Sequence, residues 1–303
     1  MDMMTRRNFT LTACAFGLSG TGTLCADSAA PDERPVVRFG VMTDSHFGDL
    51  DSTRPPHEVR AFRESARKLR EFVDTMNSRK VDFIVELGDF VEHHPSKEKS
   101  LASLERIERE FSRFNGPRYH VLGNHDLQAI PREEFVRHTA NAGEAKGRAH
   151  YSFEKNTVTF IVLDHGYFAD GVPMGPGRTD WTKGHLSVEQ WRWLDGVLAA
   201  AKGKVIVFSH WRLDPMGHGG LTALDADRMR EVFKKSGKVV ASFAGHHHYG
   251  DYMNIDGIGY YCLKAMCTGS GTENNSYAEV SVYPSGKVQV TGFRRAESKI
   301  WTP

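Results

Sequence analysis

The sequence predicts an α/β fold with parallel strands early in the chain and antiparallel strands late. Short apolar runs alternate with amphipathic stretches between residues 36 and 243, and hairpin-like β segments follow from Tyr252 onward. Alternating strands and helices are typical of parallel sheets, whereas short turns join antiparallel strands. With 303 residues, of which 40% are hydrophobic, the chain is also long enough to bury a sizeable core.

Strands and helices are expected where the hydrophobic pattern has the matching period. The segment 81–87 is a near-continuous apolar run, which indicates a buried strand. The segment 57–77 places Phe62, Leu69 and Phe72 on one face of a helix. The other predicted strands are residues 36–42, 119–122, 151–153, 158–163, 204–208 and 239–243, and the other predicted helices are residues 100–114, 187–201 and 225–235.

Polar residues and glycines mark several boundaries. Ser187, with Gln190 at the third helical position, is the expected cap of one helix, and Gly237 ends another. The loop 171–184 is rich in glycine and proline and is long enough to be functional rather than a mere connection. Hairpin turns are expected at Lys155-Asn156, around Gly257 and at Ser285-Gly286.

The charge balance argues against a general attraction to nucleic acid or to an anionic membrane. The chain has 39 lysines and arginines against 38 aspartates and glutamates, a net charge of +1. An anionic ligand must therefore be bound by a local group of side chains. The 15 histidines are the unusual feature of the composition, because histidine is the side chain that most often binds transition metals.

The first 30 residues are predicted to be an export signal, followed by one domain over residues 31–303. Arg6 and Arg7 precede a mildly apolar stretch that has no charged residue until Asp27. Adjacent arginines at this place resemble a twin-arginine signal. That resemblance implies a bacterial periplasmic or secreted protein, exported already folded by the twin-arginine export machinery. No stable membrane association is expected once the signal is removed.

The four cysteines leave two interpretations open. Cys14 and Cys25 lie in the export signal, and no CxxC pair indicates a zinc site. Cys262 and Cys267 would lie roughly 16 Å apart on one continuous strand, too far to bond, so a disulfide requires a turn between them. The alternative is two separate, half-buried thiols.

Five segments place metal-type side chains directly after a predicted strand. They are Asp44-Ser45-His46, Gly88-Asp89, Gly123-Asn124-His125-Asp126, Ser209-His210 and Gly245-His246-His247-His248. The carboxyl ends of parallel strands meet at one edge of a sheet, so these segments can converge. Residues two apart in an extended chain face the same way, which pairs Asp44 with His46 and His246 with His248. The glycines in these segments allow tight turns and close backbone approach.

This mixture of carboxylate, amide and imidazole groups suits transition metals such as manganese, iron, cobalt or zinc. Seven side chains are too many for one tetrahedral ion but fit two ions that share a carboxylate. Two such ions about 3.5–4 Å apart can clamp an in-line displacement and lower the pKa of a bridging water to roughly 7. The pattern therefore predicts a hydrolytic centre with two metal ions.

The set DxH, GD, GNHD, H and GHxH, in this order over about residues 39–249, resembles the calcineurin-like metallophosphoesterases. The resemblance implies a four-layer αββα sandwich, in which two mixed β-sheets are flanked by helices and a dinuclear metal site lies at the carboxyl ends of the strands. It implies two divalent or trivalent transition-metal ions (manganese, iron or zinc). It also implies hydrolysis of phosphate esters by attack of a metal-bridging hydroxide.

The resemblance implies a role for each residue of the five segments. Asp44, His46 and His248 would bind one metal ion, Asn124, His210 and His246 the other, and Asp89 would bridge both. His125 would not bind metal but would face the leaving group as a general acid or stabilise developing charge. Asp126 would hold the His125 ring through its other nitrogen.

Three further histidines are candidate substrate contacts. His93 and His94 follow Asp89 by a few residues, and His218 lies in a glycine-rich loop after His210. These positions are close in sequence to the expected metal ligands, so their side chains could line the same pocket.

Residues 39–46, 60–65 and 86–90 look most like one branch of the family, the Mn-dependent ADP-ribose/CDP-alcohol diphosphatases and related bacterial phosphoesterases. That branch implies a small phosphorylated metabolite or nucleotide as substrate, cleaved as a mono-, di- or pyrophosphate ester. The balanced charge gives no support to a nuclease, so no nucleic acid is expected as a partner. The alternative is a non-catalytic metal-binding or scaffold protein on the same fold. Such a protein would lack several ligands or the pair His125 and Asp126, and none of these residues is missing here.

Overall fold

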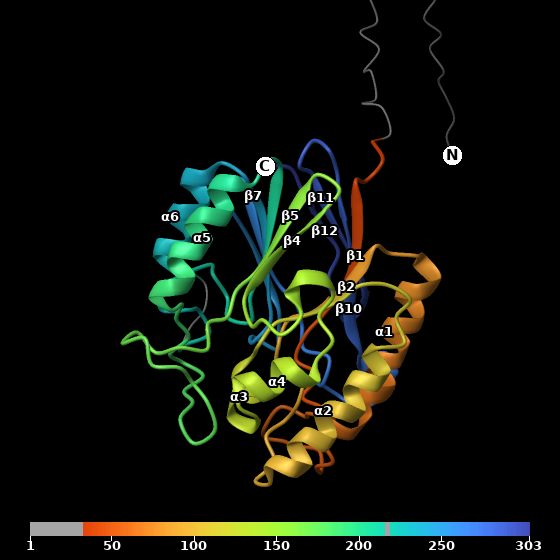
Figure 1. Ribbon diagram of the computed structural model, residues 1–303. Coiled ribbons are helices and arrows are strands. Elements are labelled where there is room, and N and C mark those ends of the chain that lie inside the picture. The colour runs from red at the N-terminus through yellow and green to blue at the C-terminus, as the bar shows by residue number, and fades with distance from the viewer. Residues whose placement is uncertain (1–32, 216–218) are drawn as a thin grey trace, which may run out of the picture. The chain divides into compact units, whose positions relative to one another are not determined.

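Two six-stranded sheets pack against each other in the computed structural model, which describes residues 33–215 and 219–303 (Figure 1). In spatial order the first sheet consists of β12 (Lys299–Trp301), β11 (Val288–Arg294), β10 (Ser276–Val282), β1 (Val37–Met42), β2 (Phe83–Glu86) and β3 (Arg118–His120). The second consists of β4 (Tyr151–Lys155), β5 (Val158–Val162), β6 (Lys204–Phe208), β7 (Val239–Ala244), β9 (Ile258–Cys262) and β8 (Asp251–Ile255).

Both sheets are mixed. The strands β1, β2 and β3 are parallel, and β10 pairs antiparallel with β1. In the second sheet β5, β6, β7 and β9 are parallel, while the edge strands β4 and β8 are antiparallel to their neighbours. The parallel strands of each sheet therefore bring their carboxyl ends to one edge, as expected for strands joined by helices.

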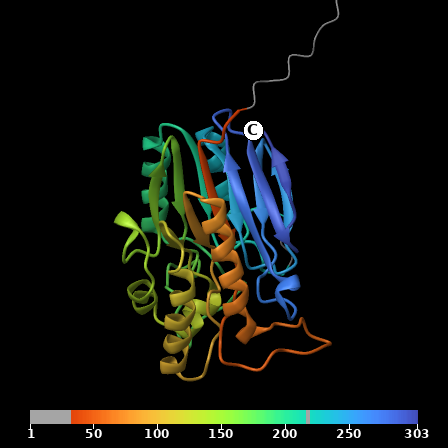
Figure 2. The same cartoon turned by 90° about the vertical axis from the view of Figure 1, so that its right-hand side faces the viewer.

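Helices cover the outer faces of both sheets (Figures 1 and 2). Two of them, α1 (Ser65–Arg79) and α2 (Lys97–Phe111), lie on the first sheet, and α5 (Val188–Ala200) and α6 (Ala226–Ser236) lie on the second. The predicted αββα sandwich is confirmed. Shorter elements are α3 (Asn124–Ala129), α4 (Arg132–His138) and the 3-10 turns η1 (Phe62–Glu64), η2 (Gly143–Ala145) and η3 (Thr272–Asn274). Within the described residues, no helix is long and apolar enough to cross a bilayer.

An aromatic cluster joins the two sheets. Phe39 on β1 stacks on Phe83 of the same sheet, with ring centroids 5.0 Å apart. Across the interface its ring meets Phe160, Phe208 and Phe243 edge-to-face at 5.6, 5.5 and 5.8 Å. Such contacts add to the burial of the rings themselves, so this cluster fixes how one sheet sits on the other.

Most predicted elements are confirmed within a few residues. Ser187 caps α5 by accepting a hydrogen bond from the Gln190 N–H at 3.1 Å, and Gly237 ends α6 in the left-handed conformation. The helix predicted over 100–114 begins earlier, at Lys97, because Ser96 caps it. The short helices α3 and α4 were not predicted.

The helix predicted over 57–77 starts later than expected. Residues 57–61 are not helical, and α1 follows only after the turn η1. The Arg60 N–H donates to Thr53 Oγ1 at 2.7 Å, and the Glu58 carboxylate contacts Nδ1 of His248 at 2.6 Å. These contacts hold the segment away from the helical path, so the prediction of its start was wrong.

Cys262 and Cys267 are separate thiols and are not bonded to each other. Both are buried more completely than expected, and burial raises the pKa of Cys267 to about 11. Residues 1–30, with the predicted export signal, lie outside the described part of the chain.

A buried charge cluster lies under the end of β3. Nδ1 of His120 contacts Glu86 at 3.1 Å and Nε2 contacts Glu108 at 3.2 Å. Burial by itself lowers the pKa of His120, but the two carboxylates outweigh it and raise that pKa to about 9. The folded state therefore holds a proton that the unfolded chain loses near pH 6.5.

We predict that wild type is more stable than His120→Gln by an amount that depends on pH. Because the folded pKa lies above the unfolded one, the contribution of His120 is fully present below pH 6.5 and is lost as the pH rises through about 9. Its size is on the order of 3 kcal/mol. Urea unfolding of both proteins from pH 6 to 10 measures it, and a difference that does not change with pH would contradict the prediction.

Candidate metal centre

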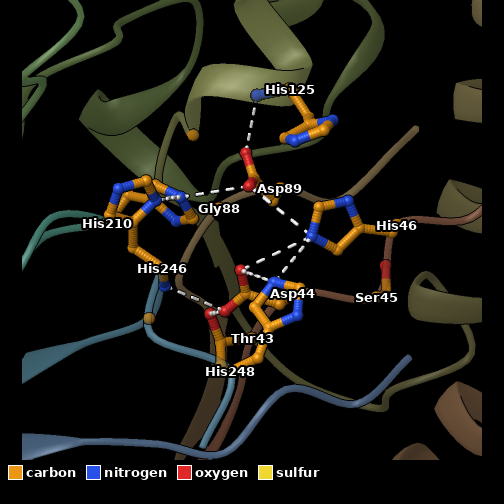
Figure 3. A network of polar contacts seen from close by, with 12 residues as sticks. Thr43, Asp44, Ser45, His46, Gly88, Asp89, His125, His210, His246 and His248 are labelled. Carbon is orange, nitrogen blue, oxygen red and sulfur yellow. Dashed lines mark hydrogen bonds and ion pairs between the residues drawn. The ribbon is translucent and has the colours of Figure 1, made fainter. Parts of the chain in front are cut away.

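All seven predicted ligands gather at the carboxyl edge of the two sheets, and Figure 3 labels all of them except Asn124. Asp44 and His46 follow β1, Asp89 follows β2, Asn124 opens α3 after β3, His210 follows β6, and His246 and His248 follow β7. Their side chains are almost wholly buried. Segments separated by up to two hundred residues thus meet because each is the end of a parallel strand or its direct continuation.

Asp44, His46 and His248 form the first group of donor atoms. The Nε2 atoms of His46 and His248 lie 3.1 Å apart. Oδ1 of Asp44 lies 3.6 Å from Nε2 of His46 and 3.3 Å from Nε2 of His248, and it has no hydrogen-bond partner. Its other oxygen, Oδ2, accepts from the Thr43 hydroxyl at 2.6 Å and from the His246 N–H at 3.1 Å.

Asn124, His210 and His246 form the second group. Nε2 of His210 lies 3.2 Å from Oδ1 of Asn124 and 3.2 Å from Nδ1 of His246. Asp89 stands between the groups, since its Oδ2 is 3.2 Å from Nε2 of His210 and 3.6 Å from Nε2 of His46. The Asp89 carboxylate therefore lies close to imidazole nitrogens of both groups.

The outward nitrogen of each imidazole is held by an acceptor. Nδ1 of His46 contacts Glu92 at 2.9 Å, and Nδ1 of His248 contacts Glu58 at 2.6 Å. For His210 and His246 the acceptors are the backbone carbonyls of Leu87, at 2.9 Å, and Trp181, at 3.1 Å. A carbonyl or a carboxylate can only accept, so each outward nitrogen carries the hydrogen. A neutral imidazole bound in this way turns a lone pair toward the centre.

The inward nitrogens have the spacing of ligands on one metal ion. Two lone pairs facing each other at 3.1–3.2 Å repel unless a proton or a cation lies between them. Ligand atoms at about 2.0–2.2 Å from a shared ion are separated by roughly this distance. The buried Oδ1 of Asp44 has no hydrogen-bond partner, so it also needs a positively charged partner. The donor set therefore fits two cations, one at each group.

Four carboxylates at the centre have lowered pKa values. Burial by itself raises the pKa of Glu58, but the hydrogen bond from His248 and the charges nearby lower it to about 2. The pKa values of Asp44, Asp89 and Glu92 are likewise held well below their ordinary range, because contacts with histidines outweigh the cost of burial. This concentration of negative charge favours a bound cation.

Backbone strain is concentrated at the same place. Asp44, His46, Asp89 and His246 have positive φ angles of 51°, 43°, 52° and 68°. Only four other non-glycine residues in the described part of the chain share this conformation. Each such residue costs on the order of 1 kcal/mol or more and persists where the surroundings dictate it, as at functional sites.

Two glycines make room for the ligands. A Cβ atom at Gly123 would collide with the backbone nitrogen and Oδ1 of Asp89, and one at Gly245 would collide with Oγ1 of Thr43 and Oδ2 of Asp44. The glycines that the sequence places before the ligands therefore serve close backbone approach, as expected.

The predicted contact between Asp126 and the His125 ring is wrong. Asp126 instead accepts hydrogen bonds from the backbone N–H groups of Val91 and Gly123, both at 3.0 Å, at the start of α3. The carboxylate that holds the ring is Glu92, which lies 2.7 Å from Nδ1 of His125 and also contacts His46. Burial and the charges of Glu86 and Asp89 raise the pKa of Asp126. Its two backbone hydrogen bonds make it a structural cap of α3.

The predicted substrate contacts are placed differently. His94 lines a separate cavity beside Phe47 and Arg106, and its Nδ1 accepts from the Ser96 N–H at 3.0 Å. His93 has a buried Nδ1 without a partner and does not line the cavity at the metal centre. His218 lies outside the described residues.

Sequence reasoning gave no role to Glu58, Glu92 or Cys267. The Sγ atom of Cys267 lies within 4.8 Å of ligand nitrogens of His46 and His248. Glu92 follows Asp89 by three residues, which is a usable signal for a nearby acceptor. Glu58 and Cys267 carry no such local signal, because only the tertiary fold brings them to the centre.

An open cavity of about 450 Å³ lies over the centre. Its floor contains Asp89, Asn124, His125, His246 and His248. Its walls are formed by Glu58, Arg60, Trp181, Leu221, His247 and Tyr249. The volume falls in the range of small-molecule sites.

Comparison with known proteins agrees with this geometry. The profile of the calcineurin-like phosphoesterase family matches residues 37–250, which include all seven candidate ligands and His125. The chain belongs to the calcineurin-like phosphoesterase family. The predictions of this family and of a phosphoester hydrolase are thus confirmed.

Relatives and solved structures give the same placement. The chain is 29% identical over 306 residues to a manganese-dependent ADP-ribose/CDP-alcohol diphosphatase of Arabidopsis thaliana, covering 88% of this chain and 96% of that protein. The human protein of the same name is 24% identical and is covered to 92%. A dimetal phosphatase from Danio rerio superposes with a TM-score of 0.76 at 21% identity, covering 88% of this chain and 99% of that one, and so has the same fold.

We predict that Glu58→Gln lowers the affinity for Mn²⁺ about tenfold or more. The substitution removes the charge that fixes the His248 ring, and loss of such a partner typically costs 10–100-fold in metal affinity. Calorimetric titration of chelator-treated protein measures the effect. Glu189→Gln, at an exposed position of α5, is the matched control. Equal affinities in Glu58→Gln and the control would contradict the role given to Glu58.

Proposed function

We propose that this phosphoesterase uses two divalent cations to hydrolyse a phosphate ester or anhydride bond in a small nucleotide derivative. One observation carries the proposal: four imidazole lone pairs and two ionised carboxylates converge beneath an open cavity that also holds His125. The diphosphatase names of the relatives support a nucleoside diphosphate compound, such as ADP-ribose or a CDP-alcohol, as the substrate, and manganese as the cation.

The proposed ligands divide by the two groups of donor atoms. Asp44, His46 and His248 would hold one cation, and Asn124, His210 and His246 the other, with Asp89 shared between them. When bound, the two cations neutralise charge on the phosphate oxygens and acidify a water molecule, which is the chemistry that the chain alone lacks.

His125 is suited to move a proton at the leaving group. Its Nδ1 is held by the Glu92 carboxylate at 2.7 Å, and the ring is 24% exposed in the floor of the cavity. This hydrogen bond fixes the ring. In the doubly protonated imidazolium form it occupies the Nδ1 proton and leaves the Nε2 proton for transfer to the departing oxygen. Glu92 thereby couples the orientation of His125 to that of the proposed ligand His46.

Arg60 supports the binding of a second phosphate. Its guanidinium lines the cavity, where it pairs with Glu58 at 3.2 Å and its side chain remains 30% exposed. Arg63, the other arginine of this segment, is instead paired with Asp49 and Asp51 on the surface. The positive charge of the Arg60 guanidinium, in addition to the metal centre, suits a substrate with two linked phosphates.

A scaffold role on the same fold is the alternative. The site gives it no support. Asp44, His46, Asp89 and His246 have strained backbone, and Gly123 and Gly245 allow close approach to the proposed ligands. Strain of this kind is costly to folding and suits a site selected for chemistry. A scaffold would also have no need of the Glu92–His125 pair.

We predict that Asp89→Asn and His125→Ala each lower turnover of ADP-ribose at least about a hundredfold in the presence of Mn²⁺. The two variants should differ in metal content: Asp89→Asn loses bound cations, whereas His125→Ala retains both. His57→Ala, at an exposed histidine that is not among the residues lining the cavity, is the matched control. Steady-state kinetics and elemental analysis of the same preparations measure both effects.

A panel of ADP-ribose, CDP-alcohols, p-nitrophenyl phosphate and its bis-ester, each with added Mn²⁺, Zn²⁺ or Fe²⁺, tests the substrate. Near-wild-type turnover in both variants would refute the assigned roles. Absence of turnover on every ester, with cations bound, would favour the scaffold alternative.

A further inference from the structure

Two exposed aromatic side chains stand at the cavity over the metal centre. Trp181 is 49% exposed and Tyr249 is 63% exposed, and both line this cavity. No other aromatic hydrophobic side chain in the described part of the chain is so exposed. Single exposed apolar residues are common. Two large exposed rings that line the same polar cavity instead indicate a binding site for a ligand.

Hydrogen bonds fix the backbone that carries the indole of Trp181. The backbone carbonyl of Trp181 accepts a hydrogen bond from Nε1 of the buried Trp211 at 2.7 Å and another from Nε2 of His246 at 3.1 Å. The next residue, Thr182, is tied to Asp180 through its N–H at 2.9 Å and its hydroxyl at 2.6 Å. The ring centroid lies 5.9 Å from that of His246. The exposure of the indole is thus built into the loop 171–184.

Tyr249 has a comparable support. Its ring packs edge-to-face on His247, with centroids 5.9 Å apart. His247 is in turn bound through Nδ1 to the guanidinium of Arg212 at 2.9 Å. Arg212 is buried and paired with Asp214 and Asp251. The chain of contacts from Asp214 and Asp251 through Arg212 and His247 therefore fixes the position of the Tyr249 ring.

The chemistry of the cavity changes from floor to wall. The floor carries the proposed cation ligands and His125, which address phosphate, and Arg60 adds a positive charge. Leu221 and the exposed rings of Trp181 and Tyr249 add an apolar part to the lining of the same cavity. A ligand that fits the metal-binding part and the apolar part has a phosphate joined through a short linker to a flat ring. A nucleotide has this structure. Stacking on aromatic side chains binds any base through its π-face.

We propose that Trp181 and Tyr249 form a nucleobase subsite, which holds the base of the substrate while its phosphate lies over the metal centre. This inference rests on the proposed function, because it names the part of the same site that selects nucleotides over other phosphate esters. Neither ring belongs to the proposed cation ligands or proton donors, so both residues act on specificity and binding rather than on chemistry.

Binding of two simple probes to the Mn²⁺-loaded protein tests the subsite. AMP carries a base and ribose 5-phosphate lacks one. Calorimetric affinities are compared for wild type, Trp181→Ala, Trp181→Phe, Tyr249→Ala and Ile300→Ala, the last being an exposed apolar control on β12. Trp181→Ala should weaken AMP about tenfold or more and leave ribose 5-phosphate unchanged. Tyr249→Ala should act in the same direction, and Trp181→Phe should retain most of the affinity for AMP.

The outcomes separate this inference from the proposed function. Equal weakening of AMP and ribose 5-phosphate would overturn the subsite, since it would show a contact with sugar or phosphate or a disturbed loop. Unchanged AMP affinity in both alanine variants would overturn it as well. If the proposed hydrolysis fails, turnover is absent in wild type for every ester, while the selective loss of AMP binding remains measurable. In kinetics, the subsite predicts a raised KM for ADP-ribose with kcat nearly unchanged.

Discussion

The structure depends on holding several nitrogen and oxygen lone pairs close together in one buried site. Four imidazoles turn lone pairs toward one another at 3.1–3.2 Å within each group, and the carboxylates of Asp44 and Asp89 stand beside them in a buried environment. Such an arrangement repels itself unless protons or cations fill it. Rigid parts of the fold must therefore hold the donors, and strand ends, positive φ angles and close-fitting glycines all serve this requirement.

The acceptors behind the imidazoles connect the centre to the cavity walls. Glu58 fixes His248 and also pairs with Arg60 in the wall. The Trp181 carbonyl fixes His246 while the indole of the same residue faces the cavity. Loops that follow the strands thus orient the ligands and shape the substrate site at once. A change in such a loop alters specificity and the electronic environment of the centre together.

The fold and the seven converging side chains could be predicted because they follow from local patterns. Each apolar strand ends directly before a polar ligand, and parallel strands end at one edge. The residues behind the ligands could not be predicted in the same way. Glu58 lies in a segment whose hydrophobic spacing matches a helix, but contacts with His248, Thr268 and Thr53 hold this segment out of one. The assignment of Asp126 failed because the backbone N–H groups at the start of α3 bind its carboxylate.

Anomalous diffraction from crystals of the Mn²⁺-loaded protein tests the central claim most directly. The account predicts two manganese peaks per chain, one in contact with Nε2 of His46 and His248 and the other with Nε2 of His210 and Nδ1 of His246, with Asp89 touching both. A single peak, or manganese bound only elsewhere while these nitrogens remain unliganded, would contradict it.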